Sequence, residues 1–126
     1  LKNIINEYID KCKAFSLFNK SFIEKYRTSS LNFFEKYIGV KKTEVINDLL
    51  TYYNTWDQYS LCLNYLKLIK NKPIDTKNIL VQNLLKILVM NINPNPTKRY
   101  SIGKTIEEFK KLKTLKITKN YGFGIH

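Results

Sequence analysis

Apolar residues recur every three or four positions along most of the chain, and this spacing places them on one face of an α-helix. The first stripe covers residues 2–18 and the second residues 18–26, with Thr28-Ser29-Ser30 expected to form a loop and a helix cap. A third stripe over 31–38 ends at Gly39, because glycine adopts the left-handed conformation that closes a helix at little cost. The pattern predicts consecutive amphipathic helices in this part of the chain.

Residues 56–69 form the stretch around which we expect the other helices to pack. They are apolar on more than one face, which is typical of a helix at the centre of a domain. Asn54 or Thr55 is predicted to cap its start, because a short polar side chain there accepts a free backbone N–H. Asp57 would then lie in the first turn, where the helix dipole favours a carboxylate.

Two further helices flank this central stretch. The first follows Thr43 as its cap and has its apolar stripe over residues 45–53. The second follows Asp75 or Thr76 and has a broad apolar stripe over 79–90.

The last third of the chain is predicted to contain a turn, a helix and a tail. Asn93-Pro94-Asn95-Pro96 indicates a rigid extended or turn segment, and Ser101 is a good cap for a last stripe over 102–112. Residues 114–118 alternate in polarity and suggest a weak strand. We therefore expect an all-α fold of six or seven helices, with a helical domain over 1–113 and a basic irregular tail over 114–126.

Positive charge is concentrated in the second half of the chain. Residues 1–63 carry nine basic and seven acidic side chains, whereas residues 64–126 carry thirteen basic and three acidic ones, for a total of +12. Such asymmetry suggests an anionic neighbour, namely nucleic acid, a membrane surface or an acidic protein, although a solvated lysine surface explains it equally well. The sequence contains only two arginines, which is few for a protein that reads phosphates and bases.

The basic end supports one functional hypothesis, a helical nucleic-acid-binding protein or a structural protein of a virion or ribosome. Its lysines would contact phosphates and its tyrosine would stack on a base. These residues are Lys104, Lys110, Lys111, Lys113, Lys116, Lys119 and Tyr121.

Residue types that carry catalysis or bind metals are sparse. Cys12 and Cys62 lie among apolar residues with no CxxC pair, which favours buried free thiols in a reducing, non-secreted setting. The single histidine, His126, gives no support for a zinc site. Glu107 and Glu108 are helix neighbours that point apart, so paired-acid hydrolysis has no support either. No apolar run approaches the ~20 residues that span a bilayer.

Two parts of the chain, residues 56–60 and residues 93–109, carry a resemblance to a known family. Trp56-Asp57-Gln58-Tyr59-Ser60 is followed, further along, by Asn93-Pro94-Asn95-Pro96-Thr97-Lys98-Arg99-Tyr100-Ser101 and then Thr105-Ile106-Glu107-Glu108-Phe109. This succession resembles the C-terminal lobe of the divergent serine/threonine protein kinases of large DNA viruses. The resemblance covers about half of the chain, and Cys62 stands where the family usually has glycine.

The resemblance implies structural roles for Trp56, Ser60 and three charged residues. Asp57 would be a buried carboxylate that accepts N–H bonds from the catalytic loop. Arg99 would be a buried guanidinium paired with an acid near the end of the activation segment, with Glu44 as the candidate and Glu35 as its rival. The simpler interpretation makes Asp57 a helix-start acid and Arg99 an exposed loop residue.

The resemblance also implies what the segment lacks. His-Arg-Asp, Asp-Phe-Gly and Gly-x-Gly-x-x-Gly do not occur, and Gly122-Phe123-Gly124 has no helix after it. The segment would thus contain no catalytic residue and bind no cofactor, whereas the intact parent would use ATP and magnesium. Its partner would be a missing N-terminal kinase portion or a protein substrate, unless the chain is a degenerate relative that serves as a binding module. A virion or host-cytoplasmic location follows from the resemblance alone.

Overall fold

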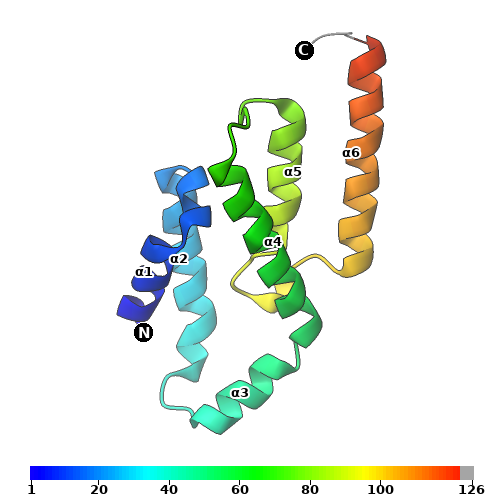
Figure 1. Ribbon diagram of the computed structural model, residues 1–126. Helices are drawn as coiled ribbons and strands as arrows, with labels where there is room; N and C mark the ends of the chain where they lie inside the picture. The colour runs from blue at the N-terminus through cyan, green and yellow to red at the C-terminus, as the bar shows by residue number, and fades with distance from the viewer. Residues whose placement is uncertain (123–126) are drawn as a thin grey trace.

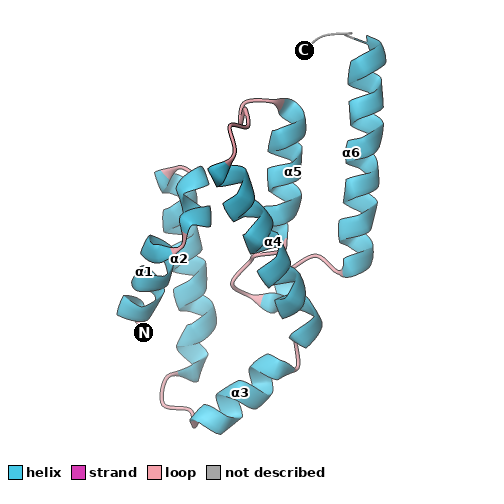
Figure 2. Cartoon of the chain, in the orientation of Figure 1, coloured by secondary structure: helices cyan, strands magenta, loops and turns pink. Residues whose placement is uncertain are grey.

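The fold is all-α, as the sequence predicted. The structure is a computed structural model that describes the backbone of residues 1–122 and the side chains of residues 1–114. Its six α-helices are joined by short connections, and the described residues contain no strand (Figures 1 and 2). The helices are α1 (Lys2–Lys11), α2 (Lys20–Phe34), α3 (Lys42–Leu50), α4 (Tyr53–Asn71), α5 (Ile79–Met90) and α6 (Ile102–Gly122).

Helix α4 is the centre of the core, because it packs against α5 on one side and against the 3-10 turn Lys13–Leu17 on the other. Its buried face consists of Cys62, Leu63, Leu66 and Ile69, and Leu66 is fully buried. These side chains pack in one cluster with residues of α1, of the 3-10 turn and of the α5 end: Ile5, Ile9, Ala14, Phe15, Leu88 and Ile92.

The opposite face of α4 is exposed, which the sequence did not predict. Leu61, Tyr65 and Leu68 lie four and three residues apart and are all at least half exposed. A helix that appears apolar on every face is therefore buried here on one face only. It also begins at Tyr53, so Asn54 and Thr55 lie inside it and do not cap its start.

The amino-terminal segment differs from the predicted single helix over 2–18. It breaks at Cys12, whose backbone is extended, and continues as the 3-10 turn. This change of direction carries Phe15 into the core, where its ring lies 4.7 Å from the ring of Tyr26.

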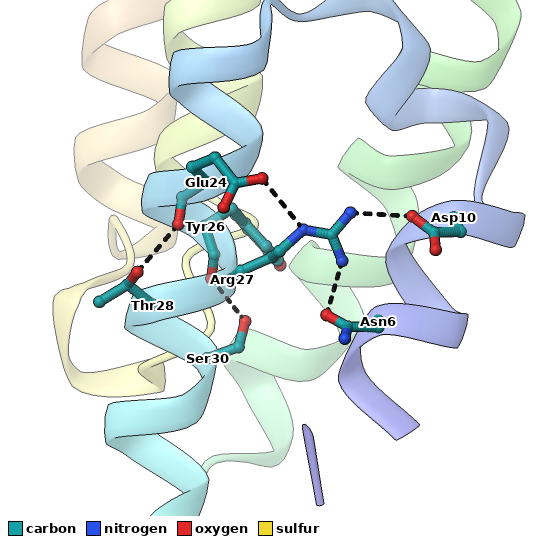
Figure 3. A network of polar contacts seen from close by, with 7 residues as sticks. All are labelled: Asn6, Asp10, Glu24, Tyr26, Arg27, Thr28 and Ser30. Atoms are coloured by element: carbon teal, nitrogen blue, oxygen red, sulfur yellow. Dashed lines mark hydrogen bonds and ion pairs between the residues drawn. The ribbon is translucent and has the colours of Figure 1, made fainter. Parts of the chain in front are cut away.

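Helix α2 runs straight through Thr28-Ser29-Ser30, so the predicted loop there is wrong. The Thr28 hydroxyl donates to the Glu24 carbonyl at 3.0 Å, and the Ser30 hydroxyl donates to the Tyr26 carbonyl at 2.8 Å (Figure 3). Such bonds to the preceding turn satisfy the hydroxyls within the helix.

Arg27 of α2 joins this helix to α1 (Figure 3). Its guanidinium donates to Asn6 at 2.7 Å and to Asp10 at 2.9 Å, and it lies 3.5 Å from Glu24. The contacts to Asn6 and Asp10 join α2 to α1, whereas the contact to Glu24 lies within α2.

Helix α3 lies apart from the core, as an arm between the ends of α2 and α4 (Figure 1). It follows Gly39, whose φ of 78° confirms the predicted helix stop. Its N-cap is Lys41 and not Thr43, and it buries no side chain. Its attachment is polar, because the Tyr37 hydroxyl donates to Asp48 and the Trp56 indole donates to the Leu49 carbonyl at 3.1 Å.

Helices α5 and α6 pack together at the other side of α4. Asn78, and not Asp75 or Thr76, caps α5 by accepting from the Leu80 N–H at 2.8 Å. Fully buried Asn91 at the α5 end accepts from Gln58 of α4 at 3.3 Å and lies 3.2 Å from the Thr105 hydroxyl of α6. One carboxamide therefore contacts all three helices.

Helix α6 begins as predicted but ends later. The Ser101 hydroxyl accepts from the Lys104 N–H at 3.1 Å, which confirms this cap. The helix then continues to Gly122, so neither a strand over 114–118 nor an irregular segment over 114–122 is present. The alternating polarity of residues 114–118 does not prevent a helix. Leucine, isoleucine and lysine can all occupy helix positions, whereas glycine and proline interrupt a helix. Residues 123–126 lie outside the described part.

Both cysteines are free, as expected from the sequence, but Cys12 is only half-buried where a buried thiol was expected. Cys62 is buried, and burial raises the pKa of its thiol to about 11. Among the described residues, no helix combines the length and the apolar character that crossing a membrane requires.

Candidate functional site

The loop between α5 and α6 is held in shape by its own asparagines and prolines. Asn93 Oδ1 accepts from the Asn95 N–H at 2.9 Å, and Asn95 Oδ1 accepts from the Thr97 N–H at 3.0 Å. Pro94 and Pro96 restrict the backbone between these turns. A short 3-10 turn, Pro96–Lys98, then leads to Arg99.

Arg99 is a buried cation at the junction of this loop with α4. It is 7% exposed, and its Nε donates to the Asn93 carbonyl at 2.6 Å. Its other nitrogens lie at longer range, 3.4 Å from the Thr55 hydroxyl and 3.5 Å from the Pro94 carbonyl. The guanidinium carbon lies 3.9 Å from the ring centroid of Trp56 and 4.7 Å from that of Tyr59. Aromatic faces stabilise a cation in this arrangement.

No carboxylate of a described residue forms an ion pair with Arg99. Burial accordingly lowers the pKa of its guanidinium to about 10, because the charged form is partly removed from water. Buried charges are usually paired, so a guanidinium held only by carbonyls, a hydroxyl and rings has capacity for an anion.

Three tyrosine hydroxyls form a chain beside this guanidinium. The Tyr59 hydroxyl lies 2.5 Å from that of Tyr8 and 3.1 Å from that of Tyr26, and the Tyr26 hydroxyl donates to the Ile92 carbonyl at 2.7 Å. Burial raises the pKa of all three phenols above their usual range. They are neutral donors and acceptors at neutral pH, and they connect α1, α2 and α4.

A cavity of about 420 Å³ opens between these elements. Its walls are mostly apolar and include Ile4, Phe34 and Trp56, whereas Arg99 supplies the only charged side chain among its lining residues. An apolar cavity with one cation and several hydroxyls is suited to an anionic group carried on an apolar stem.

The structure brings together some of the predicted site residues and separates others. Trp56 stacks on Arg99, and Ser60 lines the same cavity. Arg99 is buried, so the simpler interpretation of an exposed loop residue is wrong. Its expected partner Glu44 is exposed and forms no ion pair with it, and neither does the rival Glu35.

The expectation for Asp57 is not met. Its side chain is exposed, and within the described residues it has no hydrogen-bond or ion-pair partner. Helix α4 begins at Tyr53, so Asp57 lies beyond its first turn. Asp57 is four residues before Leu61 and therefore shares the exposed face of α4 with Leu61, Tyr65 and Leu68. Neither the buried carboxylate nor the helix-start acid describes its position.

The basic end is only partly available for an anionic partner. Lys104 and Lys111 form ion pairs with Glu108 at 2.8 and 3.2 Å. Lys110 and Lys113 are exposed on α6. The side chains of Lys116, Lys119 and Tyr121 lie outside the described part.

Tyr8, Tyr26 and Tyr59 were not predicted as site residues, because Tyr8 and Tyr26 fall on apolar stripes and Tyr59 was named only within the stretch that carries the resemblance. Their signal was the residue type itself, since a buried tyrosine hydroxyl usually finds a hydrogen-bond partner. Three tyrosines on three predicted helices could have suggested a shared polar contact.

A scan against protein-family models and searches of curated proteins and of solved structures found no match to this chain.

Proposed function

We propose that this chain is the C-terminal-lobe scaffold of a divergent serine/threonine protein kinase-like protein, of the kind encoded by large DNA viruses. The observation that supports the proposal is the contact between Arg99 and Trp56, at 3.9 Å from guanidinium carbon to ring centroid. The two parts of the chain that carry the resemblance lie far apart in the sequence and are in contact through these two side chains. Thr55, next to Trp56, also faces the Arg99 guanidinium at 3.4 Å.

Arg99 would act as an anchor for an acidic side chain that belongs to the phosphoryl-transfer portion. The cavity beside it has room for that side chain, and the guanidinium is without a carboxylate among the described residues. A bidentate contact with a carboxylate would compensate for part of the hydration that the Arg99 guanidinium loses on burial. Glu44 and Glu35 are exposed, so in this proposal the acid comes from outside residues 1–126.

The intact protein would transfer the γ-phosphoryl group of ATP to a protein hydroxyl in the presence of magnesium. Among the described residues, no group of three or more histidine, cysteine or acidic side chains could hold a metal ion. We propose that ATP and magnesium bind to a portion outside this sequence, which would carry the catalytic motifs that residues 1–126 lack. A virion or host-cytoplasmic location belongs to the same proposal.

The test uses the natural reading frame that contains residues 1–126, expressed with its adjoining coding sequence. We expect magnesium-dependent transfer of labelled phosphate to a serine- and threonine-containing protein substrate. Arg99→Ala should reduce transfer at least about tenfold, because an unanchored segment misplaces the reacting groups. Lys70→Ala removes an exposed charge on α4 that lies neither at the cavity beside Arg99 nor in the loop, and it serves as the control.

Arg99→Lys separates an anchoring role from a general effect on folding, since it keeps the charge but not the planar fork. If Arg99→Lys transfers less phosphate but unfolds at the same urea concentration as the wild type, the result supports an anchoring role for Arg99. A full reading frame that neither binds ATP nor transfers phosphate would overturn the kinase proposal.

The length of α6 favours a second candidate function, nucleic-acid binding by a basic helix. Its six lysines against two glutamates lie on one continuous helix and not on an irregular tail. A salt titration tests this function, because phosphate contacts release counterions and affinity must fall steeply as salt increases. Lys110→Ala with Lys113→Ala should then weaken RNA or DNA binding, and the absence of binding at low salt would exclude it.

A further inference from the structure

A second cavity lies on the other side of the loop between α5 and α6, toward the end of α2. Its volume is about 390 Å³, and in Figure 1 the loop that forms one wall is drawn in yellow. Ser29, Asn32 and Phe33 of α2, followed by Lys36, form the facing wall. The loop contributes Asn93, Asn95, Thr97 and Lys98.

The loop asparagines leave mainly hydrogen-bond donors available in this cavity. Asn93 Oδ1 and Asn95 Oδ1 are already occupied, because they accept from the backbone of Asn95 and Thr97. Asn95 Oδ1 also accepts from the Thr97 hydroxyl at 2.7 Å. Within the part of the chain that the structure describes, the carboxamide nitrogens of both asparagines have no such bond and can donate to a ligand.

Two lysines and no carboxylate line the cavity. The Lys98 ammonium has no acidic partner within the described side chains. The Lys36 ammonium lies 4.6 Å from the ring centroid of Phe33 and 5.0 Å from that of Tyr37, so aromatic faces hold it at the cavity wall.

Among the described side chains, Asp48 on α3 is the only acid that offsets this charge by an ion pair. It lies 3.9 Å from Lys36, which is a long distance for an ion pair, and it also accepts from the Tyr37 hydroxyl. Asp48 does not line the cavity. The net charge facing a ligand therefore stays positive.

The donors on the loop are held in place before any ligand arrives. Arg99 donates to the Asn93 carbonyl at 2.6 Å, and Pro94 and Pro96 restrict the same segment. A donor set that is already ordered loses less entropy when a ligand binds.

We propose that this cavity binds a phosphate group, either as free phosphate or as the phosphate of a small monoester. A phosphate dianion has enough acceptor oxygens to use two ammonium groups and several amide and hydroxyl donors at once. The cavity falls within the ~300–1,000 Å³ typical of small-molecule sites, which leaves room for the organic part of an ester. The site does not depend on the kinase-like function, because it lies on the other face of the loop and uses other side chains.

The test is a titration of isotope-labelled full chain followed by NMR, with the ionic strength held constant. The probes are sodium phosphate, glycerol 3-phosphate, adenosine 5′-monophosphate and, as a comparison, sodium chloride. We expect saturable shifts of the Asn32, Asn95 and Thr97 amides and of the Asn93 and Asn95 side-chain amides. Tighter binding of one ester than of free phosphate would identify the monoester as the source, and equal binding would identify the free ion.

Variants on both walls separate this site from general attraction to a basic surface. Lys36→Ala and Lys98→Ala should each weaken phosphate binding by about tenfold. Lys110→Ala with Lys113→Ala removes more charge from a distant helix and should leave the affinity within about twofold. Asp48→Asn should strengthen binding, because it removes the acid beside Lys36.

Three results would overturn the proposal. One is a shift pattern spread over the lysines of α6 as strongly as over the loop. Another is unchanged affinity in both Lys36→Ala and Lys98→Ala. The third is binding of an RNA oligonucleotide at the same residues with much higher affinity than any monoester, which would assign the site to nucleic acid.

Discussion

Helices α3 and α4 follow one another in the chain and have similar apolar stripes, but their surroundings differ. Leu66 of α4 is fully buried, whereas Ile46 and Leu50 of α3 are 44% and 59% exposed. The reason is the presence or absence of neighbours, because α4 lies between other helices and α3 extends as an arm (Figure 1). The comparison teaches that a periodic stripe predicts a helix but does not say whether anything covers it.

The two helices also differ in the kind of contact that holds them. Packing of apolar side chains holds α4, and polar contacts to Asp48 and to the Leu49 carbonyl hold α3. Elements with few buried apolar contacts open at low free energy. We therefore expect the stability of this protein to reside in the α4 surroundings.

The largest effect should follow truncation of the buried face of α4. Leu66→Ala should lower the free energy of unfolding by about 2–5 kcal/mol, because it removes buried methyl groups and leaves a cavity. The matched variant Leu50→Ala, on α3, should change it by no more than about 0.5 kcal/mol. Urea unfolding followed by circular dichroism measures both. Equal losses in the two variants would show that α3 is packed as well as α4.

The next effect concerns the cation that links α4 to the loop. Arg99→Ala should lower the free energy of unfolding by about 1–3 kcal/mol, since the Asn93 carbonyl loses its donor and the ring faces lose their cation. Lys98→Ala removes the same charge from an exposed position and should have an effect within about 0.5 kcal/mol. Similar values for the two variants in urea unfolding would contradict the contribution of the Arg99 contacts.

The fold class was predictable because helices are specified locally, by the spacing of Leu, Ile and aromatic residues, by Gly39 and by Ser101. The interruption at Cys12 and the continuity of α2 through Ser30 were not, because the first depends on tertiary packing and the second on side-chain bonds within the helix that residue type does not specify. Phe15 must reach the core, and Ser30 satisfies its hydroxyl on the Tyr26 carbonyl. The polarity of neighbouring residues predicts neither the break at Cys12 nor the continuity of α2.

At the candidate site, the sequence identified Arg99 and Trp56 through a resemblance but not what surrounds them. The Tyr8, Tyr26 and Tyr59 hydroxyls meet only because α1, α2 and α4 converge. Glu44 was chosen as the acid by its spacing, yet α3 extends away from the core and leaves Glu44 exposed. Positions set by tertiary packing between distant segments are not encoded in the spacing of one segment.

A smaller, pH-dependent effect should distinguish the tyrosine chain near α4 from ordinary surface tyrosines. Tyr8, Tyr26 and Tyr59 have raised pKa values in the folded protein, chiefly through burial, so the unfolded chain loses these protons first as pH rises. Their contribution to stability is present below about pH 10 and is lost as pH increases above it. Arg99, whose pKa is lowered to about 10, acts in the opposite direction but is one group against three.

Tyr59→Phe tests this effect. At neutral pH it should cost about 1 kcal/mol, because the hydroxyls of Tyr8 and Tyr26 lose a partner. The difference from wild type should shrink above about pH 10, where the wild-type protein alone loses the Tyr59 contribution. Urea midpoints measured at about pH 8 and about pH 11 give the comparison. A difference that is constant with pH would show that the Tyr59 pKa is not raised.

The smallest expected effect lies on the solvent side of α4 and bears most directly on the resemblance. Asp57 is exposed and unpaired among the described residues, so Asp57→Ala should change the free energy of unfolding of this chain by less than about 0.5 kcal/mol. A buried carboxylate with N–H donors would instead cost about 1–3 kcal/mol when truncated.

The same variant measured in the full reading frame separates two explanations of the exposure of Asp57. If another portion of the protein supplies N–H donors to Asp57, the loss of unfolding free energy appears only in the full reading frame. Asp57 is then a docking point for that portion. If the cost stays small in both, Asp57 is a surface acid, and only Arg99 and Trp56 remain in support of the kinase-like scaffold.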